Sequence, residues 1–352
     1  MKVREHQREP LRRDLMVGLI LLALIMVTIA FRLISQPLQV SIVILSFVGL
    51  LFFITPYVLS INPVLVKIIR ENLATHRRLL WLLPISLYLL SLLYLALAGL
   101  LTVKLFISAT LFCFLPIGLV LLAQRKSSLI NWLDGLAVLA LWLPIEFGLF
   151  SGASIPPRHS ILNLYHVVGL VLLIYSYLVL RELPPVGLTY RLKFKEVQLA
   201  IQNCIIFFIP ALLLGLPTGF IHLSHRVPGF TEMAATFLAI GFFIALPEEI
   251  LFRAIIQNGL EQKWQNQTQG IKKSLLVTSL IFGLAHANNH NPPFINIDFG
   301  SLGVWHFPWV YVVLATLAGV AYGWTFIKTR KVTAAALVHL LVDWVWSIFF
   351  NG

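Results

Sequence analysis

Two adjacent glutamates, Glu248 and Glu249, lie in a stretch, 231–257, that is otherwise apolar enough to cross a bilayer, and Arg253 follows four residues later. Ionisable side chains at that depth are costly unless they are paired, so they are rare and usually functional. On a helix, Glu249 and Arg253 are i and i+4 with the acid first, which favours an ion pair. Glu248 is turned about 100° away. The spacing therefore predicts one structural carboxylate and one free carboxylate.

Two further apolar stretches each carry a histidine, with Phe282 four residues before His286 and His339 four residues before Asp343. On the helix rise, Glu248 and Asp343 stand about 15 Å from the inner ends of their spans, His286 about 18 Å and His339 about 9 Å. Groups on three helices at a similar depth can meet. The sequence therefore predicts one polar cluster inside the membrane.

A carboxylate beside a histidine in a partly dry cavity forms a general-base system that can activate water. His339 and Asp343, on one helix face, would offer hydrogen-bond donors to a developing oxyanion. In an alternative arrangement, Glu248, His286, His339 and Asp343 would ligate a divalent metal such as zinc. Hydrolysis of a peptide bond within or beside the membrane fits both arrangements.

Composition excludes an ordinary soluble protein. Hydrophobic residues make up 59% of the 352 and charged residues 11%, against about 25% charged in a soluble domain. We expect an all-α, polytopic transmembrane helix bundle, since a span needs roughly 20 mostly apolar residues. Cys113 and Cys204 lie in apolar spans, and neither a disulfide framework nor a thiol nucleophile is indicated. About eleven candidate spans occur, at 15–34, 40–59, 79–101, 105–123, 129–150, 161–180, 197–216, 231–257, 274–287, 309–327 and 333–350.

The distribution of lysine and arginine tests this span count. With the N-terminus in the cytoplasm, 21 of the 26 basic residues fall in inside segments. Outside segments hold four, namely Arg32, Lys104, Arg158 and Arg226, while Arg253 lies within a span. This split follows the positive-inside bias and predicts a topology with the N-terminus in and the C-terminus out. Topology thus explains most of the net charge of +12, and no nucleic-acid partner is expected.

One shift in composition divides the chain, at the polar segment 181–196. It predicts a six-span accessory membrane region, residues 1–190, followed by a five-span catalytic domain, residues 191–352. Asp134 and Glu146 lie in the fifth span of the first region. Asp134 is near the inner end of that span, where we expect it to contact water.

The polar motifs occur in a fixed order: Glu-Glu-x-x-x-Arg at 248–253, Phe-x-x-x-His at 282–286 and His-x-x-x-Asp at 339–343, with a small-residue helix at 318–323 before the last. In order and helix placement, this set resembles the CPBP family, which comprises the CAAX prenyl endopeptidases and bacteriocin-processing or self-immunity proteins and is also called the ABI family. The resemblance covers roughly residues 197–352, and nothing comparable is found in the first six spans.

The resemblance implies a role for each matched residue. Glu248 would be the general base, working with His286 on the nucleophilic water, and His339 and Asp343 would stabilise the oxyanion. The residues that would support the site are Glu249, Arg253 and Phe282. Position 343 is Asp here, where the prenyl-protein endopeptidases resemble one another in having Asn. Because an ionised Asp cannot donate a hydrogen bond, it would need to be protonated, to orient His339 or to bind a metal.

These observations predict an intramembrane endopeptidase, of glutamate or metallo type, that cleaves a membrane-associated or lipidated CAAX-like protein or peptide near the cytoplasmic side. The expected partners are membrane lipids and that substrate, and a divalent metal is the open alternative for a cofactor. The expected location is a bacterial plasma membrane, in which the chain is a multi-pass protein.

Two other functions compete with this one. A non-proteolytic scaffold or immunity protein would keep the polar core for stability, but it would need only the Glu249–Arg253 pair. A proton-coupled transporter would use Glu248, His286 and Asp343 as a proton relay. The transporter is disfavoured because the chain has no repeated halves of the kind that transporters show.

Overall fold

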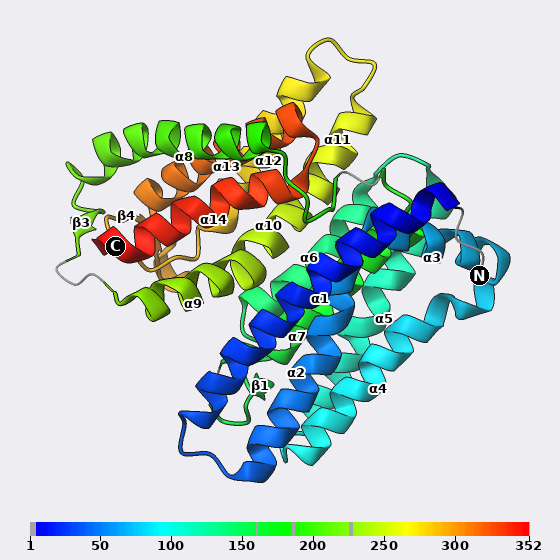
Figure 1. Ribbon diagram of the computed structural model, residues 1–352. Coiled ribbons are helices and arrows are strands. Elements are labelled where there is room, and N and C mark those ends of the chain that lie inside the picture. Colours follow the sequence, from blue (N-terminus) through cyan, green and yellow to red (C-terminus); the bar gives the residue numbers. More distant parts are fainter. Residues whose placement is uncertain (1–4, 160, 185–186, 225–227, 352) are drawn as a thin grey trace. The chain divides into compact units, whose positions relative to one another are not determined.

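The computed structural model describes residues 5–159, 161–184, 187–224 and 228–351, which are mainly helical (Figure 1). The chain forms two compact units, Met1–Pro185 and Val186–Gly352. Their division falls inside the polar segment that the composition singled out. Three of the basic residues that entered the charge count, Lys2, Arg4 and Arg226, lie outside the described residues.

The first unit is a bundle in which α1 packs on α2, α5 on α6, and α2 on α7. In chain order its elements are α1 (Glu5–Ile34), α2 (Val40–Ser60), α3 (Pro63–Thr75), the 3-10 turn η1 (Arg77–Trp81), α4 (Leu82–Leu97), α5 (Val103–Lys126), α6 (Trp132–Glu146), the antiparallel ribbon of β1 (Ser154–Ile155) and β2 (Leu162–Asn163), α7 (Leu164–Ile174) and the π-helical η2 (Tyr175–Leu180). Helices α6 and α7 begin where the side chains of Asn131 and Asn163 accept a hydrogen bond from the backbone N–H two residues on, which satisfies a free donor of the first turn.

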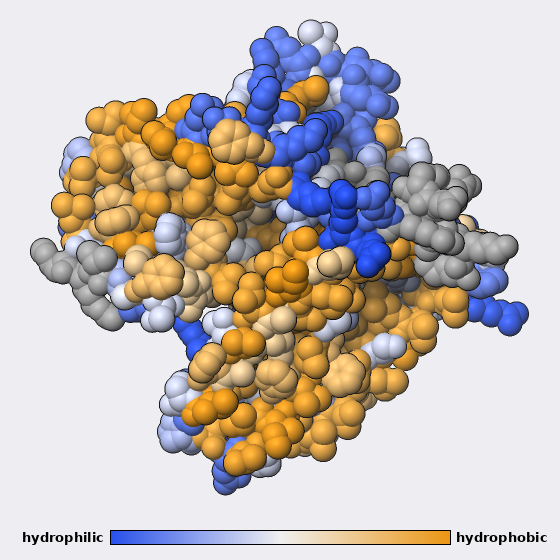
Figure 2. Space-filling view, in the orientation of Figure 1, coloured by the Kyte–Doolittle hydropathy of each residue, from blue (hydrophilic) through white to orange (hydrophobic). Residues whose placement is uncertain are grey.

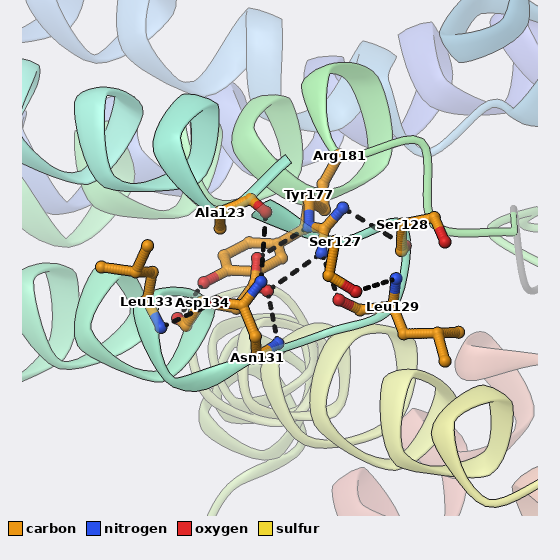
Figure 3. Close-up of polar contacts among 9 residues, drawn as sticks. All are labelled: Ala123, Ser127, Ser128, Leu129, Asn131, Leu133, Asp134, Tyr177 and Arg181. Carbon is orange, nitrogen blue, oxygen red and sulfur yellow. Dashed lines mark hydrogen bonds and ion pairs between the residues drawn. The ribbon is translucent and has the colours of Figure 1, made fainter. Parts of the chain in front are cut away.

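A buried ion pair joins η2 to the start of α6 (Figure 3). Arg181 Nε donates to Asp134 Oδ1 at 2.9 Å, and Nη2 donates to Oδ2 at 3.2 Å. The same guanidinium donates to the carbonyls of Ser128 and Leu129, at 3.3 and 2.5 Å, and the Tyr177 hydroxyl donates to the Asp134 carbonyl. Asp134 is only 4% exposed. The expectation that it contacts water is therefore wrong, because Arg181 supplies the polar contacts that water would have made.

The second unit holds the helices that carry the polar motifs. Its elements are α8 (Phe194–Gly215), β3 (His222–Leu223), α9 (Phe230–Ile240), the π-helical η3 (Gly241–Ala245), α10 (Leu246–Glu249), the π-helical η4 (Ile250–Gln257), α11 (Asn258–Lys263), α12 (Gly270–Ala285), β4 (Ile295–Asp298), the 3-10 turn η5 (Gly300–Leu302), β5 (Val304–Phe307), α13 (Trp309–Thr329), α14 (Val332–Phe349) and β6 (Phe350–Asn351). Strand β3 pairs with β6, and β4 pairs with β5, both antiparallel.

Helices α12 and α13 approach closely because small residues lie where they meet. A Cβ atom on Gly283 would come within 1.9 Å of Thr316 Oγ1 and 2.7 Å of the Val312 carbonyl oxygen. A Cβ atom on Gly319 would lie 3.2 Å from the Cα of Ser279. Small residues let the backbones of membrane helices pack against each other, so these two glycines fix the separation of α12 and α13.

Eight helices of the described residues are long and apolar enough to cross a membrane. Seven lie at Leu11–Ile34, Val40–Ser60, Arg77–Leu97, Val103–Lys126, Phe194–Gly215, Trp309–Thr329 and Val332–Phe349, and the eighth is the continuous helix Phe230–Lys263. The other three expected spans are helical but shorter: α6 has 15 residues, α12 has 16, and the third is Leu164–Leu180. The structure thus supports an all-α membrane bundle, while the count of eleven spans stays a prediction.

The Asp134–Arg181 pair should be a main source of stability for the first unit. Replacing Arg181 with Ala strands a buried carboxylate, so we expect a loss of about 3–5 kcal/mol in the free energy of unfolding. Thermal unfolding of the detergent-solubilised chain measures this loss. The control is Lys67→Ala, which breaks the exposed pair with Glu71 and should cost less than about 1 kcal/mol. Equal unfolding midpoints for the two variants would contradict the role of the buried pair.

Candidate active site

The helix Phe230–Lys263 carries the paired glutamates at an irregular point. Pro247 lacks a backbone N–H and crowds the carbonyl of the preceding turn. The backbone is π-helical on both sides of it, in η3 and in η4. Such π-helical turns inside α-helices are frequent at functional sites. The side chains of Glu248 and Glu249 therefore project from a short α-helical turn that has a π-helical segment on each side.

Glu249 is completely buried, and both of its carboxylate oxygens are engaged. Oε2 accepts a hydrogen bond from Arg253 Nε at 2.7 Å, the i, i+4 ion pair that the spacing predicts. Oε1 lies 3.0 Å from Nδ1 of His339 on α14. A carboxylate only accepts, so His339 donates from Nδ1. Glu249 thus holds a side chain of its own helix and orients the imidazole of another.

Arg253 continues the polar network along the same helix. Its Nη1 donates to Gln257 Oε1 at 3.3 Å, and Gln257 Nε2 donates to Glu261 Oε1 at 3.2 Å. Glu261 in turn accepts a hydrogen bond at 2.5 Å from Arg330, whose side chain is 53% exposed. A stripe of i, i+4 contacts therefore runs from Glu249 to the surface.

The small-residue stretch of α13 leaves room for this network. A Cβ atom on Gly323 would lie 2.7 Å from Gln257 Oε1 and 3.0 Å from Arg253 Nη1. The backbone carbonyl of Gly323 also accepts a hydrogen bond from Gln257 Nε2 at 3.4 Å. A side chain at this position would displace Arg253 Nη1 and the Gln257 oxygen that accepts its hydrogen bond. Position 323 thus needs glycine because the buried side chains of Arg253 and Gln257 fill the space beside it.

Glu248 differs from Glu249 in its exposure and in its hydrogen bonding. Its side chain is 33% exposed, and it lines a cavity. Its Oε2 atom is buried, and no residue in the described part of the chain gives it a hydrogen bond. Nε2 of His339 lies 4.0 Å from this oxygen, beyond hydrogen-bond distance. An unpaired buried acceptor costs about 1–3 kcal/mol, and such groups in native structures call for a functional explanation.

His286 lies immediately after the last residue of α12, and its tautomer follows from one contact. Nδ1 is 2.8 Å from the carbonyl oxygen of Phe282, and a carbonyl can only accept. Nδ1 therefore carries the proton, and Nε2 of the neutral ring has a free lone pair. The ring contacts the rings of Phe282 and Tyr311, with centroids 4.8 and 5.4 Å away. His286 is thus held by packing on its ring and by a bond to its backbone neighbour.

His339 lies between two carboxylates. In addition to the contact with Glu249, its Nε2 is 3.3 Å from Asp343 Oδ2 on the same helix. The ring of Tyr322 stacks on the imidazole, with centroids 4.5 Å apart and planes 15° apart. Each nitrogen of His339 therefore faces an acidic oxygen, and its ring cannot rotate without losing the stacking and both contacts.

One cavity of about 350 Å³ brings the predicted residues together. The lining includes all four that the sequence put forward, Glu248, His286, His339 and Asp343, with Phe282 beside them. These side chains come from two helices, Phe230–Lys263 and α14, and from the end of α12, so groups at a similar depth on three spans do meet. The other expected supports, Glu249 and Arg253, lie behind this lining.

The metal alternative is not favoured by this arrangement. In the described ranges, no three His, Cys, Asp or Glu side chains are grouped so that they could hold a metal ion. Nδ1 of His339 is bonded to Glu249 and Nδ1 of His286 to a carbonyl, so each ring would offer only Nε2, as metal-bound histidines commonly do. The lack of a group of three ligands among the described residues, and not the histidine contacts, is what weighs against a resident metal ion.

Sequence reasoning missed Tyr311, Tyr322 and Asn291, which also line the cavity. Tyr322 falls inside the small-residue stretch that the sequence singled out, so that stretch was the available signal. Tyr311 carried no signal because it opens an apolar helix like any interfacial aromatic residue. Glu146, by contrast, lies at the end of α6 in the first unit and is not part of the lining.

Part of the chain matches a known protein family. Residues 230–345 match the family described as Type II CAAX prenyl endopeptidase Rce1-like. This region begins with α9 and ends just beyond Asp343, so it contains all the site residues that the sequence put forward, Glu248, Glu249, Arg253, Phe282, His286, His339 and Asp343. No curated protein and no solved structure matches the chain.

The two glutamates should respond oppositely to the same substitution. Glu249→Gln strands the Arg253 charge, so we expect a loss of about 3–5 kcal/mol in the free energy of unfolding. Glu248→Gln removes a buried charge that has no hydrogen bond, so stability should be unchanged or higher. Thermal unfolding in detergent measures both variants. A similar loss in both would contradict the division into a structural and a free carboxylate.

Proposed function

We propose that this chain is an intramembrane endopeptidase, on the premise that its residues 230–345 belong to the type II CAAX prenyl endopeptidase Rce1-like family and so to the CPBP intramembrane proteases. The family and the eight long apolar helices make it an integral multi-pass membrane protein. The substrate in this proposal is a membrane-associated or lipidated, CAAX-like protein or peptide. The proposed location is a bacterial plasma membrane, and the charge distribution supports a cytoplasmic N-terminus.

The free carboxylate of Glu248 is the observation that carries this proposal. A scaffold would be stabilised by the Glu249–Arg253 pair alone and would gain nothing from a second carboxylate without a hydrogen bond. Glu248 instead faces a cavity that also presents the unprotonated Nε2 of His286. A base and an acceptor that share one cavity suit the binding and activation of a water molecule.

In the proposed reaction, a water molecule lies between Glu248 and His286. Glu248 takes a proton from the water as the water oxygen attacks the scissile carbonyl carbon, while Nε2 of His286 accepts a hydrogen bond from the same water and orients it. The carbon–nitrogen bond then breaks, and the proton on Glu248 passes to the leaving amine. The products are a carboxylic acid and an amine, and Glu248 is again a carboxylate.

The oxyanion formed in this reaction needs hydrogen-bond donors. His339 is fixed by Glu249 and Tyr322, and we assign to it and Asp343 one side of the oxyanion site. The donor there would be the N–H at Nε2, which Asp343 orients at 3.3 Å and would share with the oxyanion. An ionised Asp343 cannot itself donate. Tyr311 lines the same cavity and makes no hydrogen bond within the described residues, so we assign its hydroxyl as the additional donor.

A second cavity supports a lipid-bearing substrate. It has a volume of about 460 Å³ and an almost wholly apolar lining, formed by Phe230, Met233, Ala234, Phe237, Leu238 and Trp344. It lies between α9, which precedes Glu248 in the chain, and α14, which carries His339. An acyl or prenyl chain bound there would lie beside the proposed catalytic groups and would be favoured by apolar burial.

Hydrolysis should depend on both groups that hold the water. We expect Glu248→Gln and His286→Ala each to lower kcat by at least about 10²-fold, because each removes a general-base contact to the water. The measurement is mass spectrometry of the tripeptide released from an S-farnesyl-cysteine peptide with three further residues. Membrane proteomics of cells with wild-type or Glu248→Gln protein extends the search to other substrates. Wild-type turnover in both variants would refute the catalytic assignment.

The Tyr311 hydroxyl should matter for turnover but not for folding. Tyr311→Phe keeps the ring against His286 and removes only the donor, so we expect kcat to fall by about 10²-fold with KM little changed. The matched control is Tyr88→Phe, which removes a hydroxyl bonded to Thr110 in the first unit. If both variants keep full activity, Tyr311 has no role in stabilising the oxyanion.

A further inference from the structure

The segment between α12 and α13 folds into a hairpin of two strands, β4 and β5, which the proposed reaction does not use. Strand β4 begins four residues after Asn291, and β5 ends four residues before Tyr311. Both of these residues line the cavity of the candidate site. Gly300 and Gly303, whose φ angles are positive, lie in the turn between the strands. The hairpin is therefore attached to the cavity lining at both of its ends.

One face of the hairpin is entirely apolar. Successive residues of a strand point to opposite faces, and residues that lie opposite each other in an antiparallel pair share a face. The pairing register places Ile295 opposite Phe307 and Ile297 opposite Trp305. These four side chains therefore project on the same side, which we call the apolar face.

The other face is mainly polar, and we call it the polar face. The register places Asn296 opposite His306 and Asp298 opposite Val304. Nδ1 of His306 donates a hydrogen bond of 2.7 Å to Oδ1 of Asn296, because an amide oxygen can only accept. This bond shows that the two side chains project on the same side. The hairpin is thus amphipathic.

Large side chains of the apolar face are exposed. Ile295 is 50% exposed and Trp305 is 41% exposed. Phe299, which directly follows β4, is 53% exposed. Single exposed apolar side chains are ordinary, whereas a contiguous group of them marks a surface that binds another protein, a ligand or a membrane. The apolar face therefore calls for a partner.

The length of α13 places the hairpin at a boundary of the bilayer. Lys328 is exposed in the last turn of α13, and Arg330 pairs with Glu261 of α11. Figure 2 shows hydrophilic residues gathered around α11 and hydrophobic residues over α8. This end of α13 therefore marks one boundary of the hydrocarbon layer. Trp309, at the other end of the 21-residue helix, lies about 30 Å away, which matches a hydrocarbon core about 30 Å thick.

The apolar face lies within the headgroup layer at that second boundary. Phe307 is two residues before Trp309, and two residues reach at most about 7 Å, roughly the thickness of the headgroup layer. Tryptophan is enriched at this depth, and Trp305 exposes its ring there. The bilayer also meets both requirements of an amphipathic element, since it offers acyl chains to one face and water to the other.

We infer that the apolar face of the hairpin binds the lipid bilayer, with Ile295 and Trp305 inserted among the acyl chains and the polar face directed to water. The anchor fixes the segment that connects Asn291 to Tyr311. Binding to lipid does not depend on the proposed function. The consequence for catalysis does rest on that function, because the anchored hairpin restrains the start of α13, where the proposed oxyanion donor lies.

Spin labels test the contact with lipid without relying on activity. In the full chain, with the two buried native cysteines replaced by Ala, one label is attached at a time through Ile295→Cys or Trp305→Cys on the apolar face. Each has a matched control one residue away on the polar face, Asn296→Cys and His306→Cys. The chain is reconstituted in liposomes of phosphatidylcholine and phosphatidylglycerol. Electron paramagnetic resonance then measures the collisions of each label with oxygen and with a water-soluble nickel chelate.

The ratio of oxygen to nickel collisions should be at least about twofold higher at Ile295→Cys and Trp305→Cys than at their neighbours, because oxygen is apolar and concentrates in hydrocarbon while the chelate stays in water. Ratios that do not differ between the faces would overturn the inference. Labels on the apolar face that meet neither reagent would show that protein covers this face, and this result overturns it as well.

A second experiment tests the consequence for catalysis. Ile295→Asn changes the apolar face, and Val304→Asn makes the same kind of change on the polar face, at a residue that is also 50% exposed. In liposomes, we expect Ile295→Asn to lower kcat/KM for the S-farnesyl-cysteine peptide several-fold and Val304→Asn to leave it unchanged. Both variants should unfold at the same temperature in detergent.

Equal kcat/KM values for the two variants in liposomes would contradict a role of the anchor in catalysis. A wild-type chain that cleaves the peptide neither in liposomes nor in detergent counts against the proposed function. The spin labels then decide independently whether the hairpin binds lipid.

Discussion

The charge of Arg253 is the constraint on which the rest of the candidate site depends. A guanidinium with no exposure to solvent is tolerated only when it is paired. Glu249 supplies the counter-charge, Gln257 supplies a further acceptor, and Gly323 leaves the space that Arg253 and Gln257 occupy. Because the second oxygen of Glu249 bonds His339, the same ion pair also sets the orientation of an imidazole on a different helix.

Glu248 and Glu249 lie in different environments because successive side chains of a helix point about 100° apart. Glu249 points into the packed interior, where every oxygen finds a donor. Glu248 points into the cavity, where the buried oxygen finds none. This contrast separates stability from chemistry: one carboxylate holds the helices together, and the other is left reactive. The π-helical turns around Pro247 shift these side chains away from regular helical positions.

Basic residues at the α13–α14 turn of the second unit are held in ion pairs. Arg330 pairs with Glu261, and Lys331 pairs with Glu196. The Arg330 pair is also the last contact of the polar stripe that starts at Glu249. The residues that favour one orientation in the membrane are thus connected, through packed side chains of one helix, to the residues that line the cavity.

The sequence by itself determined the helical membrane class and the Glu249–Arg253 pair, because hydropathy and i, i+4 spacing are local properties of a helix. For Glu248 and the two histidines it gave only a similar depth in their spans, which allows them to meet. Only the tertiary structure decided the partners that lie far apart in the chain. The bond from Glu249 to His339, the contact of Tyr311 with His286 and the burial of Asp134 beside Arg181 depend on how helices pack and rotate. Local spacing carries no information on packing between helices, so these contacts could not be predicted.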